Sequence, residues 1–180
     1  MKHLREYDIA HKGLRLGSHS FEYKIDASFL EHFEASPIED CTINVGLDLD
    51  KRETIMLLHF TINGTVKAEC DRCLQTIHLP IAADNILYIK FEDNPNKIHT
   101  EEEDIDIIYM SRSESIINVA TFIYEFLVLN IPIKAACPFE EGPNKSCNMD
   151  MIQQLNKYIV EIEPDIDPRW EVLKTLKEKK

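Results

Sequence analysis

Strict alternation of apolar and polar residues over positions 41–49 is the feature that most constrains the fold of this chain. The apolar residues occupy every odd position: Cys41, Ile43, Val45, Leu47 and Leu49. Successive side chains of a β-strand point to opposite faces, so this period of two predicts a strand with one apolar and one polar side.

Other segments of the first half carry strand patterns separated by turn signals. Residues 21–25 alternate in the same way, and Asp26 is expected to cap a short helix after them. Residues 54–62 are almost wholly apolar and run into Asn63-Gly64, the strongest short signal for a β-hairpin. Further strands are expected at residues 65–69, 74–79, 81–91 and 107–110. This succession predicts an antiparallel β meander or a partly open barrel.

The pattern becomes helical in the second half, which predicts an α+β fold. Residues 114–129 have the length and apolar content of one buried helix, with Ser113 as its cap and Pro132 as its end. Its expected core stripe is Ile116, Val119, Ile123 and Leu127. Residues 151–160 suit a short helix or a strand. Asp167-Pro168 predicts the start of a C-terminal helix.

Charge is distributed unevenly along the 180 residues, whose formal net charge is −12. Residues 1–24 carry +2 and residues 169–180 carry +3, whereas residues 25–168 carry −17. We interpret the chain as a single domain, 1–180, with basic N-terminal strands (1–24) and a basic C-terminal helix (167–180). The net acidity disfavours non-specific binding to nucleic acid, which depends on neutralising phosphates.

Two segments of this charge pattern are candidate contact sites. Residues 92–106 hold seven acidic side chains and one lysine, which is typical of a solvated loop. The sharper alternative is that Glu101, Glu102, Glu103, Asp104 and Asp106 engage a basic partner. In the C-terminal helix, Trp170 shares one face with two leucines, where packing on the body competes with a role in partner binding.

Four of the five cysteines have a spacing that suggests a metal site. Cys70 and Cys73 form a CxxC between two predicted strands, and Cys137 and Cys147 are separated by nine residues. Zinc in structural sites takes four such ligands, so we expect these four to hold a structural zinc ion. His59 and His78 are possible substitute ligands. Cys41, on the apolar side of its strand, is interpreted as a small buried hydrophobe.

Other interpretations of the cysteines remain open. Disulfides are disfavoured by an odd cysteine count and by a reducing compartment. A thioredoxin-like site needs its CxxC at the start of a helix, and the flanks here read as strands. Free thiols without a metal are the third alternative. The chain shows no secretory signal and no apolar run of about 18 residues, so we expect a cytoplasmic location without membrane contact.

Motifs for catalysis are missing from the sequence, which contains no GxSxG, P-loop, GxGxxG or HExxH. Paired carboxylates occur only as part of the general acidity. We therefore expect a protein that is not an enzyme.

The order of several motifs resembles the YceD family, the large ribosomal RNA subunit accumulation proteins. The matching segments are Val66–Leu74 with its C-x-x-C-L turn, the acidic loop with Asp104-Ile-Asp-Ile, Glu125–Ile133 followed by Cys137, and the tail Asp167–Lys177. Many relatives carry a compact second cysteine cluster, whereas residues 137–147 form a longer segment in this chain.

The resemblance implies a role in the accumulation or processing of large-subunit (23S) ribosomal RNA and in ribosome assembly. The first hypothesis is a non-enzymatic factor whose acidic body binds a basic ribosomal protein or assembly factor, with ribosomal RNA affected indirectly. The second is direct RNA binding through the basic termini, and the third is a thiol- or zinc-dependent enzyme. A four-cysteine zinc site leaves no open position for catalysis, which counts against the third.

Overall fold

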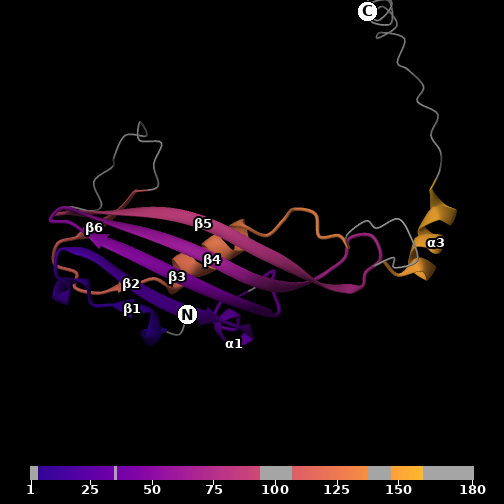
Figure 1. Cartoon of the computed structure of the whole chain (residues 1–180), viewed down its shortest axis with the longest axis horizontal. Helices are drawn as coiled ribbons and strands as arrows, with labels where there is room; N and C mark the ends of the chain where they lie inside the picture. The colour runs from indigo at the N-terminus through magenta and orange to yellow at the C-terminus, as the bar shows by residue number, and fades with distance from the viewer. Residues whose placement is uncertain (1–3, 35, 94–106, 138–146, 160–180) are drawn as a thin grey trace, which may run out of the picture. The chain divides into compact units, whose positions relative to one another are not determined.

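The computed structural model describes residues 4–34, 36–93, 107–137 and 147–159 (Figure 1). It divides into two compact units, residues 1–137 and 138–180, and each is described by itself. The first unit contains seven strands among its described residues: β1 (Asp8–Ile9), β2 (Gly17–Ile25), β3 (Cys41–Lys51), β4 (Ile55–Glu69), β5 (Thr76–Glu92), β6 (Ile107–Ser111) and β7 (Ile117–Asn118). Its α-helices there are α1 (Ala27–Leu30) and α2 (Ala120–Leu129), and two 3₁₀ turns cover Arg5–Tyr7 and His11–Gly13.

An open five-stranded sheet of order β2-β3-β4-β5-β6 forms the body of this unit. Each pair from β2 to β5 is antiparallel, and β6 lies parallel to β5 at the edge. The predicted meander and the α+β class are therefore confirmed. The predicted strand at 107–110 is present as β6, but it pairs in parallel with β5 and does not extend the antiparallel meander. A separate two-stranded sheet joins β1 to β7.

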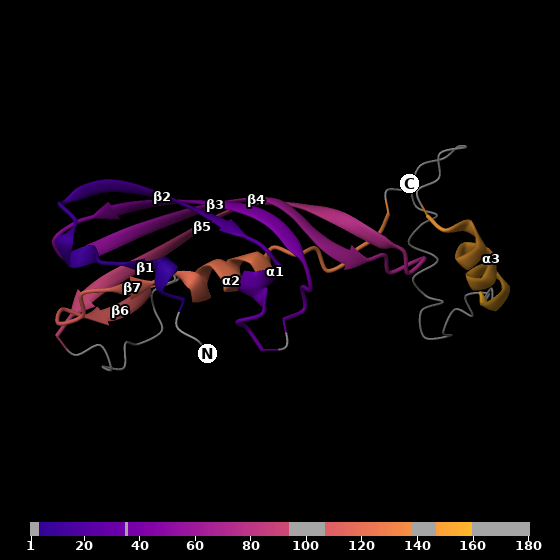
Figure 2. The ribbon, with the colours of Figure 1, turned by 90° about the horizontal axis from the view of Figure 1, so that it is seen from below.

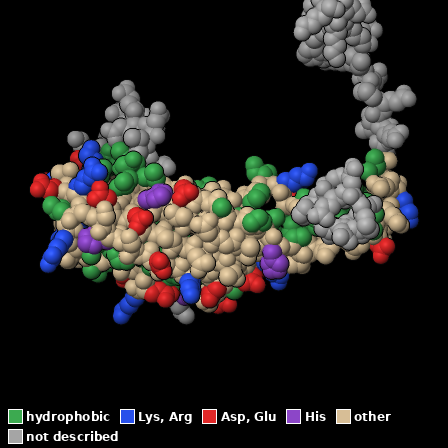
Figure 3. Space-filling view, viewed as in Figure 1, with side chains coloured by type: hydrophobic (Ala, Val, Ile, Leu, Met, Phe, Trp, Pro, Cys, Tyr) green, Lys and Arg blue, Asp and Glu red, His purple; other side chains and the backbone are tan. Residues whose placement is uncertain are grey.

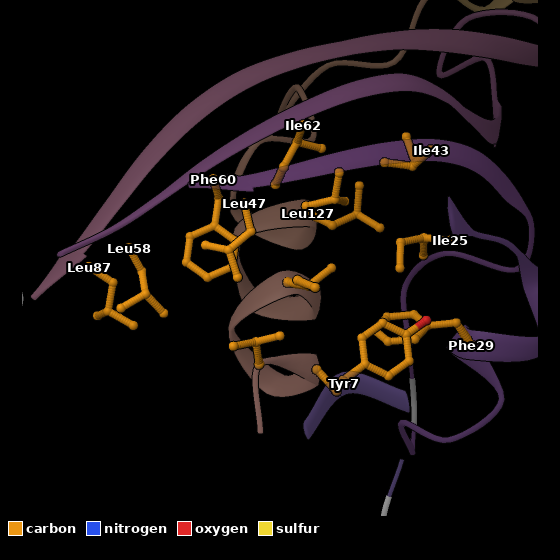
Figure 4. Packing of buried hydrophobic residues seen from close by; sticks show 14 of the residues in the cluster. Tyr7, Ile25, Phe29, Ile43, Leu47, Leu58, Phe60, Ile62, Leu87 and Leu127 are labelled. Carbon is orange, nitrogen blue, oxygen red and sulfur yellow. The ribbon is translucent and has the colours of Figure 1, made fainter. Parts of the chain in front are cut away.

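Helix α2 lies against one face of the curved sheet, as Figures 2 and 4 show. The alternation predicted for β3 is confirmed, because its apolar odd positions 41–49 are all buried toward this helix layer. From the helix, Ile123 and Leu127 are fully buried among Phe60, Leu47 and their neighbours. Burial of this shared apolar surface holds the sheet and helix together.

The predicted helix 114–129 is correct in its second part and wrong in its start. Residues 117–118 form β7 with β1, and α2 begins only at Ala120. The Asn118 side chain explains the change, because its amide donates to Leu4 O and Asp8 Oδ1 (both 2.8 Å) while its oxygen accepts from Ala120 N at 3.0 Å. Ser113 therefore caps nothing, and Ile116 of the predicted stripe is 50% exposed.

The two other helices agree with their sequence signals. Asp26 caps α1 as predicted, with Oδ1 accepting from Ser28 N at 2.9 Å. Hydrogen bonds from Ser28 lower the pKa of this carboxyl group. In the second unit, residues 149–158 form α3 (Met149–Tyr158), capped by Asn148, so the helical alternative is the correct one. No helix in the described ranges is long and apolar enough to cross a membrane.

The predicted hairpin turn at Asn63-Gly64 is wrong, because β4 continues straight through both residues. Gly64 pairs with Ile43 of β3 on one side and with Ile81 of β5 on the other. A Cβ atom at Gly64, whose φ is +156°, would lie 2.1 Å from Thr42 O and 2.8 Å from Ile43 Cα. Glycine is needed here for a close approach of two strands, which a turn signal in the sequence cannot reveal.

The predicted break between residues 79 and 81 is also absent, since β5 runs unbroken across Pro80. Pro80 pairs with Thr65 of β4, and β6 reaches β5 only from Tyr88 onward. Over this stretch β5 therefore has a neighbouring strand on one side only. Proline, which has no N–H group to donate, is tolerated in such an edge position.

We predict that Gly64→Ala destabilises the protein by about 2 kcal/mol or more, because a backbone atom of β3 must move to admit the Cβ. Gly46→Ala is the matched control in the neighbouring strand, where the new Cβ would be 4.0 Å from Thr61. Urea unfolding of both variants measures the difference. Equal stability of the two variants would contradict the close approach.

Candidate metal centre

The loop between β4 and β5 forms the tip of a long hairpin. Its last ladder pair is Glu69 with Thr76, so residues 70–75 make the turn. Cys70 N donates to Gln75 O and Leu74 N donates to Cys70 O, both at 2.9 Å. Leu74 has a φ of 57°, a left-handed conformation that is uncommon outside glycine. These two hydrogen bonds hold the CxxC segment in a tight turn.

The thiols of Cys70, Cys73, Cys137 and Cys147 form one cluster, in which the four sulfur atoms all lie within 4.8 Å of one another. The first three cysteines are buried and Cys147 is partly exposed. The Sγ atoms of Cys73 and Cys137 are 3.8 Å apart. Tetrahedral zinc with Zn–S bonds of about 2.3 Å requires sulfur atoms about 3.8 Å apart. The donor set and this spacing therefore fit a zinc ion.

Backbone amides near the cluster favour the thiolate form that a metal ion needs. Burial by itself raises the pKa of the Cys70 thiol, but hydrogen bonds from the amides of Cys137, Arg72 and Cys73 outweigh it and lower the pKa to about 6. The contact from Cys137 N to Cys70 Sγ is 3.3 Å long. Amide donors directed at a ligand sulfur are the kind of outer-shell contact that orients metal ligands.

The two residues between Cys70 and Cys73 attach the hairpin tip to the segment that carries Cys137. Asp71 N donates to Ala135 O, and Ala135 N donates to Asp71 Oδ2, both at 2.7 Å. The Arg72 guanidinium donates to Cys137 O. Asp71 and Arg72 thus clamp the third cysteine to the CxxC, a role that the cysteine spacing does not reveal. Their position inside the CxxC is the only sequence signal for it.

Other residues considered at the sequence level lie apart from this cluster. Cys41 points its thiol toward Ile25 O at 3.7 Å, and burial, with Asp40 and Asp26 nearby, raises its pKa to about 11, as expected for a buried hydrophobe. The substitute ligands His59 and His78 are not in the cluster; His59 faces Asp84 at 3.4 Å instead. The predicted contact residues 101–106 and Trp170 lie outside the described residues.

The position of the CxxC favours metal binding over thiol redox chemistry. A redox CxxC has its nucleophile at a helix N-terminus, whereas this one joins two strands of a hairpin. With four sulfur ligands, an ion held here would complete its tetrahedron with protein atoms. Its contribution would be structural, because it would hold Cys137 to the hairpin tip.

The fold and the cluster define an α+β protein with an open, mostly antiparallel sheet and a four-cysteine cluster that fits a metal ion. The chain belongs to the YceD family: the family model described as "Large ribosomal RNA subunit accumulation protein YceD" matches residues 58–177, which include all four cysteines of the cluster. Membership links the chain to the accumulation of large-subunit ribosomal RNA. Comparisons with curated proteins and with solved structures found no match.

We predict that the protein purified without added metal contains one zinc ion per chain and that Cys70→Ser loses it, because a four-sulfur site does not survive removal of one ligand at the hairpin tip. Cys41→Ser is the matched control, since that thiol lies outside the cluster. Elemental analysis by mass spectrometry gives the stoichiometry. Metal-free wild-type protein, kept reduced throughout, would contradict the site.

We predict that Asp71→Ala weakens zinc affinity by about tenfold to a hundredfold, because the segment carrying Cys137 loses the hydrogen bond from Ala135 N to the Asp71 carboxylate, while the backbone N–H of residue 71 still donates to Ala135 O. Glu69→Ala, two residues away and also exposed, is the control and keeps the wild-type affinity. Competition with a chromogenic chelator measures both variants. An unchanged affinity for Asp71→Ala would show that the clamp does not orient the ligands.

Proposed function

We propose that this chain is a non-enzymatic factor that supports large-subunit (23S) ribosomal RNA accumulation and ribosome assembly by binding a basic protein partner. The observation that carries the proposal is the combination of family membership with a net charge of −17 over residues 25–168. A polyanionic surface repels RNA and attracts the basic proteins that RNA itself binds. Action on ribosomal RNA would then be indirect.

The acidic segment Glu101–Asp106 is the proposed first contact with this partner. It holds five acidic residues in six positions, without a basic one. Complementary charge of this density mainly accelerates the encounter with a basic partner, and it disfavours the binding of acidic proteins. Trp170 and the basic C-terminal segment are proposed as a second contact. The metal centre has a separate, structural role in this proposal.

Direct RNA binding has less support. The basic ends carry only +2 and +3, which allows few phosphate contacts, and each contact loses strength at cellular salt concentrations. An enzymatic function would need a reactive group and a pocket, and the four-sulfur cluster offers no open coordination position. Protein binding is therefore the function that the charge distribution supports best.

Neutralising the acidic segment tests the proposal. In the test variant, Glu101, Glu102 and Glu103 become Gln, and Asp104 and Asp106 become Asn. The control neutralises the same number of exposed carboxylates on the body: Glu31, Glu34, Glu39, Asp40 and Glu53. We predict that crosslinking in cells recovers ribosomal proteins with the wild type and the control, and about tenfold less with the test variant.

Two results would contradict this function. Equal recovery of ribosomal proteins by the test variant and the control would remove the acidic segment from the contact. Direct RNA binding would be favoured instead by a different pattern of crosslinks to ribosomal RNA. These crosslinks would survive the neutralisation of the acidic segment and disappear when the terminal lysines and arginines are replaced.

A further inference from the structure

The solvent-facing side of the sheet changes character from one edge to the other. Over β2 and the adjoining part of β3 its side chains are small or polar: Ser18, Ser20, Glu22, Lys24, Thr42 and Asn44. At the far end of β4, β5 and β6 the same side carries apolar residues: Ile55, Leu57, Ile86, Tyr88, Ile107 and Tyr109. We call these six residues the outer patch. Figure 3 shows hydrophobic side chains gathered at this end of the sheet.

Strand register makes the outer patch continuous. Leu57 pairs with Tyr88, which in turn pairs with Ile107, so these three residues form one row across β4, β5 and β6. Ile55 and Tyr109 lie on either side of Lys90 in the next row. Directly opposite residues on one face of a sheet are in contact distance. The patch is therefore one surface rather than scattered single residues.

A sheet that packs against the core on one face does not need apolar residues on its solvent-facing side. The core is already formed on the opposite face, where Met56, Leu58 and Ile89 are fully buried. The usual alternation places polar residues outward, as the β2–β3 half of this sheet does. Ile86 nevertheless stays 48% exposed. The other five residues of the outer patch are half-buried, so the patch is a contiguous, partly exposed apolar surface with a polar rim, which is typical of an interaction site.

The rim of the outer patch is acidic on the β3 side. Asp50 lies directly opposite Leu57 and forms a surface ion pair with Arg52 at 3.0 Å, and Asp48 lies opposite His59 one row further along. Asp84 borders the patch on β5, where it accepts from Thr61 at 3.0 Å. Lys90, which lies between Ile55 and Tyr109 of the patch, has its ammonium group over the Tyr109 ring at 5.7 Å from the ring centre. An apolar surface with carboxylates on its rim fits a ligand that combines apolar and basic side chains.

We propose that the outer patch docks an extended segment of a basic protein, with its apolar side chains on the tyrosines and leucine and its lysines or arginines beside Asp48, Asp50 and Asp84. The inference deepens the proposed function and rests on it, since it names a second surface for the same kind of partner. Apolar and aromatic anchors supply most of the affinity of such contacts, and the acidic rim selects for positive charge. A second copy of this chain is a poor occupant because its own acidic rim would face the first.

Short synthetic peptides test the docking surface directly. The probe is an eight-residue peptide that alternates Lys and Val, and its controls alternate Lys with Ser and Glu with Val. We expect the full-length protein to bind the Lys-Val peptide at least tenfold more tightly than either control. Equal binding of the Lys-Val and Lys-Ser peptides would show that charge alone accounts for the affinity, and it would overturn the role of the apolar residues.

Matched variants then locate the binding on the protein. Leu57→Thr with Ile86→Thr is expected to weaken Lys-Val binding about tenfold, whereas Leu16→Thr with Ile133→Thr, a leucine and an isoleucine exposed elsewhere, leaves it unchanged. Asp48→Asn with Asp50→Asn weakens it as well, and Glu22→Gln with Glu69→Gln does not. Fluorescence anisotropy gives the affinities, and circular dichroism shows that each variant folds.

The outcomes separate this inference from the proposed function. If neutralising residues 101–106 abolishes partner crosslinking while Leu57→Thr with Ile86→Thr leaves both crosslinking and peptide binding intact, the proposed function stands and the outer patch is wrong. If Leu57→Thr with Ile86→Thr loses both crosslinking and peptide binding while the neutralised acidic segment keeps them, the outer patch stands and the acidic segment is not the contact. Binding of polyuridylate that requires Tyr88 and Tyr109 would overturn the inference in favour of RNA.

Discussion

Burial of α2 against one face of the curved sheet is the interaction on which the rest of this structure depends. Ile123 and Leu127 are fully buried from the helix side, and Leu47 and Phe60 meet them from the sheet. This packing commits one face of every strand to the core and leaves the other to solvent. It therefore determines which residues remain for partner contacts and holds the long β4–β5 hairpin in its register.

That hairpin carries two cysteines of the four-cysteine cluster at the end that extends beyond the rest of the sheet. β3 accompanies β4 only as far as Val66, and the pairing of β4 with β5 continues to Glu69 and Thr76. The described residues of the tip lie outside the hydrophobic core cluster, so hydrogen bonds through Asp71 hold the Cys137 segment there, and a metal ion bound by the four cysteines would add to them. A structural ion bound here would stabilise the part of the unit that hydrophobic burial stabilises least.

Patterns that depend on one segment were readable from the sequence, and features set by neighbouring strands were not. The alternation at 41–49 predicted β3 with its buried side, and cysteine spacing predicted the members of the four-cysteine cluster. Gly64 was misread because its turn signal is local, whereas its actual cause is the backbone of β3 2.1 Å from where a Cβ would be. The start of α2 was misplaced for the same reason, since pairing with β1 competes with helix formation at residues 117–118.

The four sulfur atoms of Cys70, Cys73, Cys137 and Cys147 are arranged as a metal ion would need them, and we expect them to hold one zinc ion. Zinc K-edge X-ray absorption of the full-length protein, purified under reducing conditions without added metal, tests it most directly. We expect a first shell of four sulfur atoms at about 2.3 Å, without nitrogen or oxygen ligands. A shell that contains nitrogen or oxygen, or protein that binds no zinc, would contradict it.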